Sequence, residues 1–387
     1  MSNLRKTVLG GRSYKLNRSR VTANDFAPIT WNNYFDSYKE VKVNGDSFHC
    51  YIKDGSGPLL VTIHGGGYSA LTWALFARDV STKIDCQLLA IDLRGHGKTK
   101  TDKEYDLSLE QLSEDVLQVI QSIYAGAAMP KIILIGHSLG GAVVVEVASK
   151  LENLAGVCVI DVVEGTALDS LSGMQSILRG RPSGFKSISH AVQWGFRGGS
   201  TQNLEAARVS MPGQIINVNN GLLAADEIDS EGVGDEAASI DFKPIKAADS
   251  IQEETEDAEE GDTASMKPPL PGTAVRSSCT TDEIKYSWRI DLTKTEQHWP
   301  GWFKGLSQKF LSINAPKILL LANIYGLDTA LTVGQMQGKF QLQVLPRSGH
   351  AIHEDQPEQV ADIIATFLVR QKLANSRQGF VPIVPGC

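Results

Sequence analysis

Short apolar runs that end in polar and glycine residues recur through the first half of the chain. Four of them are PLLVTIHGGG (58–67), CQLLAIDLRGHG (86–97), KIILIGHSLGG (131–141) and LAGVCVIDVVEG (154–165). Residues at helical spacing lie between these runs, around 108–124 and 139–151. Apolar runs without polar alternation are typical of strands buried on both faces, and helices between such strands serve as crossovers. The pattern therefore predicts an α/β fold on a mostly parallel sheet with helices on both faces.

Two further patterns extend this sheet. Residues 38–55 alternate polar and apolar side chains around Asn-Gly-Asp, which predicts a β-hairpin. Late in the chain, KILLLAN (317–323) and FQLQVLP (340–346) predict two more strands. The amphipathic stretch 357–373 predicts a final helix. The sheet is thus expected to resume after a long interruption.

The interruption has two halves. Residues 166–216 carry apolar positions at helical spacing broken by Gly and Pro, which predicts a helical cap over the sheet edge. Residues 217–283 are rich in Asp, Glu, Ala, Ser and Pro, and the part from Gly221 to Asp262 holds 15 acidic residues against two lysines. Such a composition buries too little apolar surface to offset the entropy of ordering, so we expect a long disordered acidic insertion. Its charge of −13, within a total of −7, leaves +6 for the rest of the chain.

These segments predict a division of the chain into six parts. They are an N-terminal flexible tail, the first part of the sheet domain, the cap, the acidic insertion, the second part of the sheet domain and a C-terminal tail, at 1–25, 26–165, 166–216, 217–283, 284–373 and 374–387. No apolar run approaches the roughly 18 residues that span a bilayer, and the N-terminus lacks the apolar core of a secretory signal. The five cysteines are scattered and form no CxxC pair. We therefore expect reduced thiols, a cytoplasmic or nuclear location and no membrane partner.

The pentapeptide Gly136-His137-Ser138-Leu139-Gly140 fits the pattern G-x-S-x-G. It follows a predicted strand and opens a predicted helix, which is the position at which this pattern forms a sharp turn with an exposed serine. The turn is so sharp that flanking side chains would collide with neighbouring backbone, and the glycines avoid this while the serine hydroxyl is exposed. The helix that begins at Leu139 adds a positive dipole end and free N–H groups that favour an oxyanion. We therefore predict that Ser138 is a nucleophile.

A serine nucleophile needs a base, and the base needs a carboxylate that orients it. In the hydrolase fold that carries this turn, the chain order is serine, acid, histidine. His350 in RSGHAIHED follows the last predicted strand inside a short loop that contains a glycine, and it is the preferred base. We expect His353 to start or cap the final helix and His137 to point aside.

Two aspartates compete for the role of the acid. Asp161 ends the strand AGVCVID at the carboxyl edge of the sheet, where active-site loops gather. Asp328 follows KILLLAN by five residues. A carboxylate that ends a strand is rigidly held, which favours Asp161, and Glu164 and Asp169 remain as further candidates.

The segment HGGGYS (64–69) resembles a glycine loop that lends a backbone N–H to an oxyanion. We expect the donors to be Gly66 and Leu139. A phosphate-binding loop at DLRGHGKT (92–99) fails on spacing, because the first required glycine would fall at Asp92. There is no spacing typical of metal ligands and no basic and aromatic run typical of nucleic-acid binding. We expect no cofactor, no metal and no nucleic-acid partner.

Blocks outside the serine turn carry a more specific resemblance. They are IDVVEGTALDSL (160–171), LRGRPSGFKSI (178–188), NLEAARVSMPGQ (203–214), YSWRIDL (286–292), GWFKGLS (301–307), LTVGQMQGKFQLQVLP (331–346) and GHAIHED (349–355). In this order, from about residue 27 to 372, the chain resembles the protein phosphatase methylesterase family, including its acidic insertion. The family consists of α/β-hydrolases that demethylate the catalytic subunit of protein phosphatase 2A. One departure is LLLANIYGLD (319–328), where the family leads us to expect a Gly-Val-Asp-like turn.

The resemblance implies roles for residues and for partners. It makes Ser138 the nucleophile, Asp161 the acid and His350 the base, and it leaves Asp328 a bystander. The implied reaction is hydrolysis of the methyl ester on the carboxyl-terminal leucine of the protein phosphatase 2A catalytic subunit, without a cofactor. It also implies binding of the inactive phosphatase. 

Recognition of a protein substrate requires more than the triad. We expect a groove formed by the cap and the aromatic side chains of Trp299, Trp302 and Phe303. The alternative is that these three side chains are ordinary core residues. Two other functions stay open on residues alone. One is a carboxylesterase or peptidase for small molecules with the same triad, and the other is a binding protein that keeps a hydrolase shell without chemistry.

Overall fold

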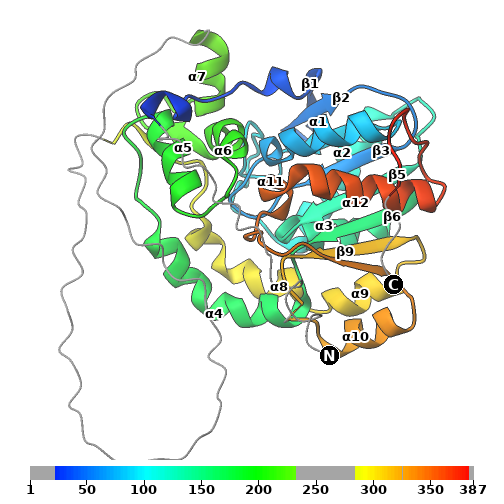
Figure 1. Ribbon diagram of the computed structural model, residues 1–387. Coiled ribbons are helices and arrows are strands. Elements are labelled where there is room, and N and C mark those ends of the chain that lie inside the picture. Colours follow the sequence, from blue (N-terminus) through cyan, green and yellow to red (C-terminus); the bar gives the residue numbers. More distant parts are fainter. Residues whose placement is uncertain (1–21, 232–283, 325, 383–387) are drawn as a thin grey trace, which may run out of the picture.

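The computed structural model describes residues 22–231, 284–324 and 326–382. At its centre lies an eight-stranded sheet in the order β1-β2-β4-β3-β5-β6-β9-β10 (Figure 1). β1 pairs antiparallel with β2, β2 pairs antiparallel with β4, and all the other neighbours are parallel, which confirms the expected mostly parallel sheet. The strands are β1 (Ser37–Val43), β2 (Asp46–Lys53), β3 (Leu59–Ile63), β4 (Gln87–Ile91), β5 (Ile132–His137), β6 (Leu154–Ile160), β9 (Lys317–Leu321) and β10 (Gln341–Val344).

The hairpin and the central strands form for the reasons that the sequence suggested. Asn44 and Gly45 both have positive φ, of 50° and 95°, which is the backbone of a two-residue turn between antiparallel strands. Every residue of β3, β5 and β9 is buried. Because alternate side chains of these strands point to opposite faces, they contribute to two separate hydrophobic cores.

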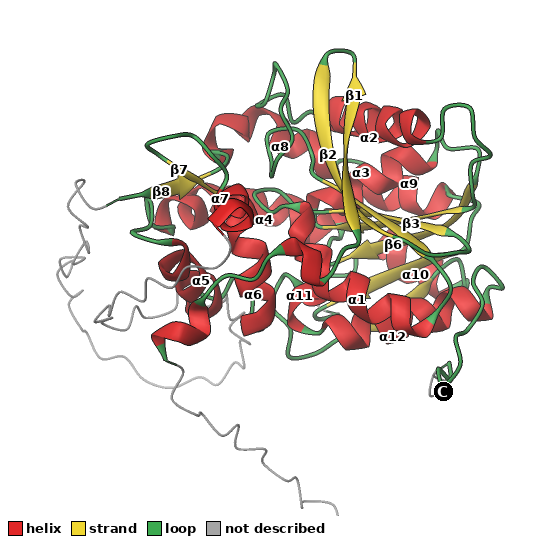
Figure 2. Ribbon diagram, turned by 90° about the horizontal axis from the view of Figure 1, so that it is seen from above, coloured by secondary structure: helices red, strands yellow, loops and turns green. Residues whose placement is uncertain are grey.

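Helices cover both faces of the sheet (Figure 2). α1 (Ala74–Lys83) and α12 (Pro357–Arg370) pack together on one face, with the four-residue α11 (Ile352–Asp355) before α12. On the other face, the core contains side chains from five helices, which are α2 (Leu109–Ile123), α3 (Leu139–Ala148), α8 (Trp299–Phe303), α9 (Leu306–Ser312) and α10 (Thr329–Met336). Parallel strands buried between two helical layers place their carboxyl ends, and the loops that follow them, at one common edge.

A helical cap lies at that edge of the sheet, as expected (Figure 1). It consists of α4 (Glu164–Gly180), α5 (Ile188–Arg197), α6 (Leu204–Ser210), the small strand pair β7 (Ile215–Asn217) and β8 (Tyr286–Trp288), and α7 (Ala224–Glu231). The expected second part of the sheet domain, 284–373, is therefore wrong at its start, because β8 pairs with β7 inside the cap. A three-residue strand whose partner lies some seventy positions away leaves no periodic signal in the sequence.

The expected disordered insertion, 217–283, is wrong over its first 15 residues. Residues 217–231 fold as the end of β7, a turn and α7, and Leu223, Ala224 and Ala225 are buried. The Glu227 carboxylate accepts hydrogen bonds from Asn217 Nδ2 at 2.7 Å and from the Tyr286 hydroxyl at 2.6 Å. The expectation rested on the composition averaged over the whole acidic segment. Such an average hides the short apolar run at 223–225 and the hydrogen-bonded Glu227. Residues 232–283 lie outside the described part.

The expected tails are shorter than 1–25 and 374–387. At the N-terminal end, the 3-10 helix Ala23–Phe26 buries the side chain of Phe26 in the cap core. Residues 1–21 lie outside the part of the chain that the structure describes. At the other end, Ser376 bridges to Ile84, and Arg377 pairs with Asp85 at 3.1 Å. No helix in the described ranges is long and apolar enough to cross a membrane.

The expectation that Trp299, Trp302 and Phe303 line a substrate groove is wrong. Their exposed fractions are 2%, 3% and 6%, and all three belong to the core on the α3 face of the sheet. Trp302 Nε1 donates a hydrogen bond to the carbonyl oxygen of Leu107 at 2.6 Å. Because this strip of aromatics is short and mixed with glycine and proline, its sequence does not say which way the rings face.

We predict that Trp302→Ala destabilises the fold and leaves the chemistry of the remaining folded protein intact. Loss of a buried indole and of its hydrogen bond should lower the free energy of unfolding by about 3–5 kcal/mol. Urea denaturation followed by circular dichroism measures this loss. The control is Ile177→Ala on α4, whose side chain is 61% exposed and which should change stability by less than about 0.5 kcal/mol. An unchanged urea midpoint in Trp302→Ala would contradict the burial.

Candidate active site

Ser138 lies on the sharp turn between β5 and α3, with φ 52° and ψ −120°. The two glycines of the pattern are required by space. A Cβ at Gly136 would lie 2.1 Å from the carbonyl oxygen of Gly140, and a Cβ at Gly140 would lie 2.3 Å from that of Ile63. The Ser138 N–H donates to the carbonyl oxygen of Ile160 at 3.0 Å, which joins the turn to β6. The backbone strain that the sequence pattern predicts is therefore present at this serine.

The glycine loop 65–67 runs beside this turn. A Cβ at Gly65 would lie 3.2 Å from Cβ of Ser138, and a Cβ at Gly66 would lie 3.7 Å from Cδ2 of Leu139. In the part of the chain that the structure describes, no protein acceptor takes a hydrogen bond from the N–H of Gly66 or Leu139. Gly66 thus lies against Leu139, the first residue of the ten-residue helix α3, and both N–H groups are without a protein acceptor among the described residues.

Two buried histidines that the sequence analysis did not assign hold the glycine loop in place. Nε2 of His64 accepts a hydrogen bond from the Leu93 N–H at 3.0 Å, and Nε2 of His96 accepts one from the Gly67 N–H at 2.8 Å. Burial lowers the pKa of His64 to about 3 and that of His96 to about 4, so both rings are neutral acceptors at neutral pH. The one sequence feature that could have indicated this role is the position of both histidines next to glycines, His64 in HGGG and His96 in RGHG.

Asp161 and His350 meet at the carboxyl edge of the sheet. His350 Nδ1 donates to Oδ2 of Asp161 at 2.8 Å, and the Ala322 N–H donates to Oδ1 of the same carboxylate at 2.9 Å. Asp161 follows β6 directly and has φ 52°, and its own N–H donates to the carbonyl oxygen of Leu320 at 2.8 Å. Because β5 and β6 are neighbours, Ser138 and Asp161 each occupy the first position after adjacent strands.

His350 is open to solvent on its other side. Its side chain is 53% exposed, against 18% for Asp161. Both Ser138 and His350 are described residues, and no hydrogen bond joins them in this arrangement. Hydrogen bonds of this kind are often long in a free enzyme and tighten when the substrate binds.

The other acid candidates have partners elsewhere. Asp328 caps α10 by accepting from the Leu331 N–H at 2.9 Å, and its second oxygen accepts from the Ser307 hydroxyl. Glu164 accepts from the Gly305 N–H at 2.7 Å and from the Ser307 N–H at 3.0 Å. Asp169 is exposed on α4. Of the four carboxylates, all in the described part of the chain, only Asp161 is hydrogen-bonded to His350.

The loop that carries His350 is attached to both the sheet and the cap. On the sheet side, His137 Nε2 donates to the carbonyl oxygen of His350 at 2.8 Å. On the cap side, Asp355 accepts from the Gly349 N–H at 2.6 Å, from the Thr201 hydroxyl at 2.9 Å and from the Gln202 N–H at 2.6 Å. These supports depend on tertiary contacts between distant segments, which no local sequence pattern predicts.

A cluster of buried titratable side chains lies behind His350. The rings of His137 and His353 lie 4.6 Å apart, and the ring of His353 packs at 4.3 Å on Trp73. His353 lies in α11, and Gln356 is the N-cap of α12, so the expectation that His353 starts or caps the final helix is wrong. Burial lowers the pKa of His353 to about 3 and that of His137 well below its ordinary value. Burial also raises the pKa of Glu354 to about 8, against a hydrogen bond from Ser210 that lowers it. Glu354 is therefore mostly protonated at neutral pH.

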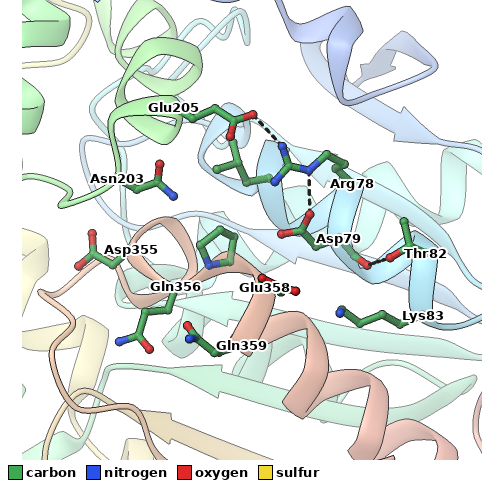
Figure 3. A pocket seen from close by; sticks show the side chains of 12 residues that line it. Arg78, Asp79, Thr82, Lys83, Asn203, Glu205, Asp355, Gln356, Glu358 and Gln359 are labelled. Carbon is green, nitrogen blue, oxygen red and sulfur yellow. Dashed lines mark hydrogen bonds and ion pairs between the residues drawn. The ribbon is translucent and has the colours of Figure 1, made fainter. Parts of the chain in front are cut away.

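A surface pocket of about 490 Å³ opens between α1, α6 and the start of α12 (Figure 3). Its lining includes Arg78, Glu205 and Asp355, and neither Ser138 nor His350 belongs to it. The Arg78 guanidinium donates to Glu205 at 2.7 Å and to Asp79 at 2.7 Å. This pocket is therefore separate from the candidate site, but Asp355 and Gln356 of its lining both hydrogen-bond to the loop that carries His350. Among the described residues, no group of three or more potential ligands could hold a metal ion.

The amino-acid sequence of this chain matches one family model and several known proteins. A model of the alpha/beta hydrolase family matches residues 60–363. The chain is 45% identical over 371 residues to Protein phosphatase methylesterase 1 of Mus musculus and of Homo sapiens, and each match covers 94% of this chain and 90% of that protein. It is 36% identical to Probable protein phosphatase methylesterase 1 of Caenorhabditis elegans, over 97% of this chain and 86% of that protein.

Solved structures share the fold at low identity. An esterase of M. tuberculosis superposes with a TM-score of 0.55 at 18% identity, covering 86% of this chain and 92% of that chain. E-2-(Acetamidomethylene)succinate hydrolase superposes with a TM-score of 0.58 at 16% identity, covering 86% and 99%. These likenesses support the fold alone.

We predict that Glu354→Gln changes how stability depends on pH. Between its ordinary pKa of 4.5 and its folded value of about 8, the folded protein holds a proton that the unfolded chain has released. The free energy of unfolding contributed by Glu354 therefore falls as pH rises through this window. Glutamine keeps the shape and does not titrate. The melting temperature of the variant minus that of the unmodified protein should rise between pH 5 and pH 8 in scanning fluorimetry.

The control for this experiment is Glu358→Gln, because Glu358 is exposed on α12. Its melting-temperature difference should stay flat over the same range. A flat difference for Glu354→Gln as well would show that Glu354 ionises normally.

Proposed function

The chain belongs to the protein phosphatase methylesterase family of the α/β-hydrolases, and from this premise we propose that it demethylates the carboxyl-terminal leucine of the protein phosphatase 2A catalytic subunit, releasing methanol. It is a carboxylic ester hydrolase. The observation that carries the proposal is the hydrogen bond from His350 to Asp161 at the end of β6, one strand from Ser138. The 45% identity over 94% of the chain to a protein named as a protein phosphatase methylesterase supports a methylated phosphatase as the substrate.

The catalytic roles follow from these positions. His350 Nε2 takes the Ser138 proton while Ser138 Oγ attacks the ester carbonyl carbon, and Asp161 holds the imidazole by its Nδ1–H. The N–H groups of Gly66 and Leu139 donate to the oxyanion that forms. The intermediate collapses as the imidazolium protonates the departing methoxide to methanol. Water then attacks the acyl-enzyme by the same route and frees a carboxylate, so the reaction needs no cofactor.

Leucine side chains pack against the glycine loop. A Cβ at Gly66 would lie 3.7 Å from Leu139 Cδ2 and 3.9 Å from both terminal carbons of Leu292. Both leucines belong to the buried core, with exposed fractions of 1% and 7%, so the glycine loop rests on an apolar support.

The partner is a folded phosphatase, and we extend the proposal to binding of its inactive form. The relatives are named for a protein phosphatase, which supports a phosphatase as the partner. The described cysteines, Cys50, Cys86 and Cys158, are buried free thiols, which fits action in the reducing cytoplasm or nucleus.

We predict that Ser138→Ala and Asp161→Asn each abolish methanol release from the methylated phosphatase catalytic subunit. Alanine removes the nucleophile, and asparagine cannot stabilise the imidazolium or fix its tautomer. Each should lower kcat by about 10⁴-fold or more. The control is Asp169→Asn, an exposed carboxylate on the neighbouring helix α4, which should retain activity within about twofold.

The same assay separates the alternatives. If unmodified protein cleaves p-nitrophenyl acetate but releases no methanol from the methylated phosphatase, it is an esterase for small molecules. If a fluorophosphonate probe fails to label Ser138, the chain is a binding protein with a hydrolase shell. Methanol release by Ser138→Ala would exclude the proposed mechanism.

A further inference from the structure

Among the described residues, most positively charged side chains that are withdrawn from solvent have carboxylate partners. Lys317, which is 7% exposed, instead donates to the carbonyl oxygen of Ile313, and Arg181 near the candidate site has no carboxylate partner either. Arg94, which is 4% exposed, donates to Asp115 at 2.8 Å and to Asp46 at 3.0 Å. The same pairing holds for Arg289 with Glu104, Lys98 with Asp226 and Asp229, Lys83 with Asp362, and Arg78 in the pocket of Figure 3. Arg181 differs, because no carboxylate of the described residues pairs with it.

Arg181 follows the carboxyl end of α4 and is partly buried. Its Cζ lies 5.1 Å from the ring centroid of Trp288, whose own Nε1 is fixed by donation to the carbonyl oxygen of Pro182 at 2.9 Å. Burial lowers the pKa of the Arg181 guanidinium, and it raises the pKa of the neighbouring Tyr68, whose hydroxyl is therefore uncharged at neutral pH. An arginine remains protonated in such a place, so the cation is desolvated without a compensating anion in the described part of the chain.

The guanidinium lies against the glycine loop of the candidate site. A Cβ at Gly67 would lie 3.4 Å from Nη1 of Arg181. Gly65 stands against Ser138, Gly66 against Leu139, and Gly67 against Arg181. Three consecutive residues therefore lead from the nucleophile past the proposed oxyanion donors to an unpaired cation.

We infer that Arg181 binds the free carboxylate of a peptide whose terminal ester has been hydrolysed at Ser138. The inference rests on the proposed function for the identity of that product, a peptide that ends in leucine. The methyl ester is neutral and gains little from a guanidinium, whereas the carboxylate supplies the anion that Arg181 lacks. A planar guanidinium also matches a carboxylate in shape, with two parallel N–H donors. The site then holds its product more tightly than its substrate.

Binding of non-reacting peptides tests this inference without relying on catalysis. The probes are two fluorescent hexapeptides that end in leucine, one with a free carboxylate and one with a carboxamide in its place. Fluorescence anisotropy with the unmodified protein should give at least about tenfold tighter binding of the acid than of the amide. Arg181→Gln should reduce this preference to within about twofold.

The matched control is Arg179→Gln. Arg179 lies two residues earlier, is exposed and donates to Gln175 Oε1 at 2.8 Å, so its loss should leave the preference unchanged. If Arg181→Gln does not fold, two measurements replace it. Arg181→Lys keeps the charge without the two-pronged geometry and should show an intermediate preference. In the unmodified protein, the preference should weaken as salt rises from about 50 to 500 mM.

Two results would overturn the inference. One is equal binding of acid and amide by the unmodified protein, and the other is a preference that survives in Arg181→Gln. Neither depends on methanol release, so a protein that fails as a phosphatase methylesterase can still show the carboxylate preference. Conversely, a working methylesterase without that preference would refute the role of Arg181 alone.

Discussion

The close approach of α3 to β3 is the constraint on which the candidate site depends. No side chain fits at Gly140, where a Cβ would lie 2.3 Å from the carbonyl oxygen of Ile63, and none fits at Gly136. Two backbones therefore lie in direct contact, and the serine turn stands beside the glycine loop. Gly66 therefore lies against Leu139, the first residue of α3. A larger residue at Gly140 would separate Ser138, the proposed nucleophile, from the glycine loop.

The sheet stabilises the strain that this contact creates. Ser138 and Asp161 both have φ 52°, a conformation that costs a non-glycine residue about 1–3 kcal/mol. Each donates its N–H to the last or next-to-last carbonyl of the adjacent strand, Ser138 to Ile160 and Asp161 to Leu320. Because β5, β6 and β9 are buried between two helical layers, these hydrogen bonds are shielded from water and hold both turns. The two side chains are fixed at the sheet edge by the same device on successive strands.

Local signals determined what the sequence could predict. The parallel strands and the turn at Ser138 depend on hydrophobic runs and on glycines within a few residues, and Asp161 ends a strand visibly. Features set by distant partners were missed. β8 pairs with β7, α7 is stabilised by Tyr286 from beyond the acidic segment, and Trp302 turns inward to reach Leu107. The neutral states of His64 and His96 likewise follow from burial, which composition does not reveal.

His350 differs from Ser138 in what holds it. Ser138 is fixed by the sheet and by α3 alone, whereas the loop of His350 is attached to the sheet through His137 and to the cap through Asp355. The separation between Ser138 and His350 therefore depends on how the cap sits on the sheet.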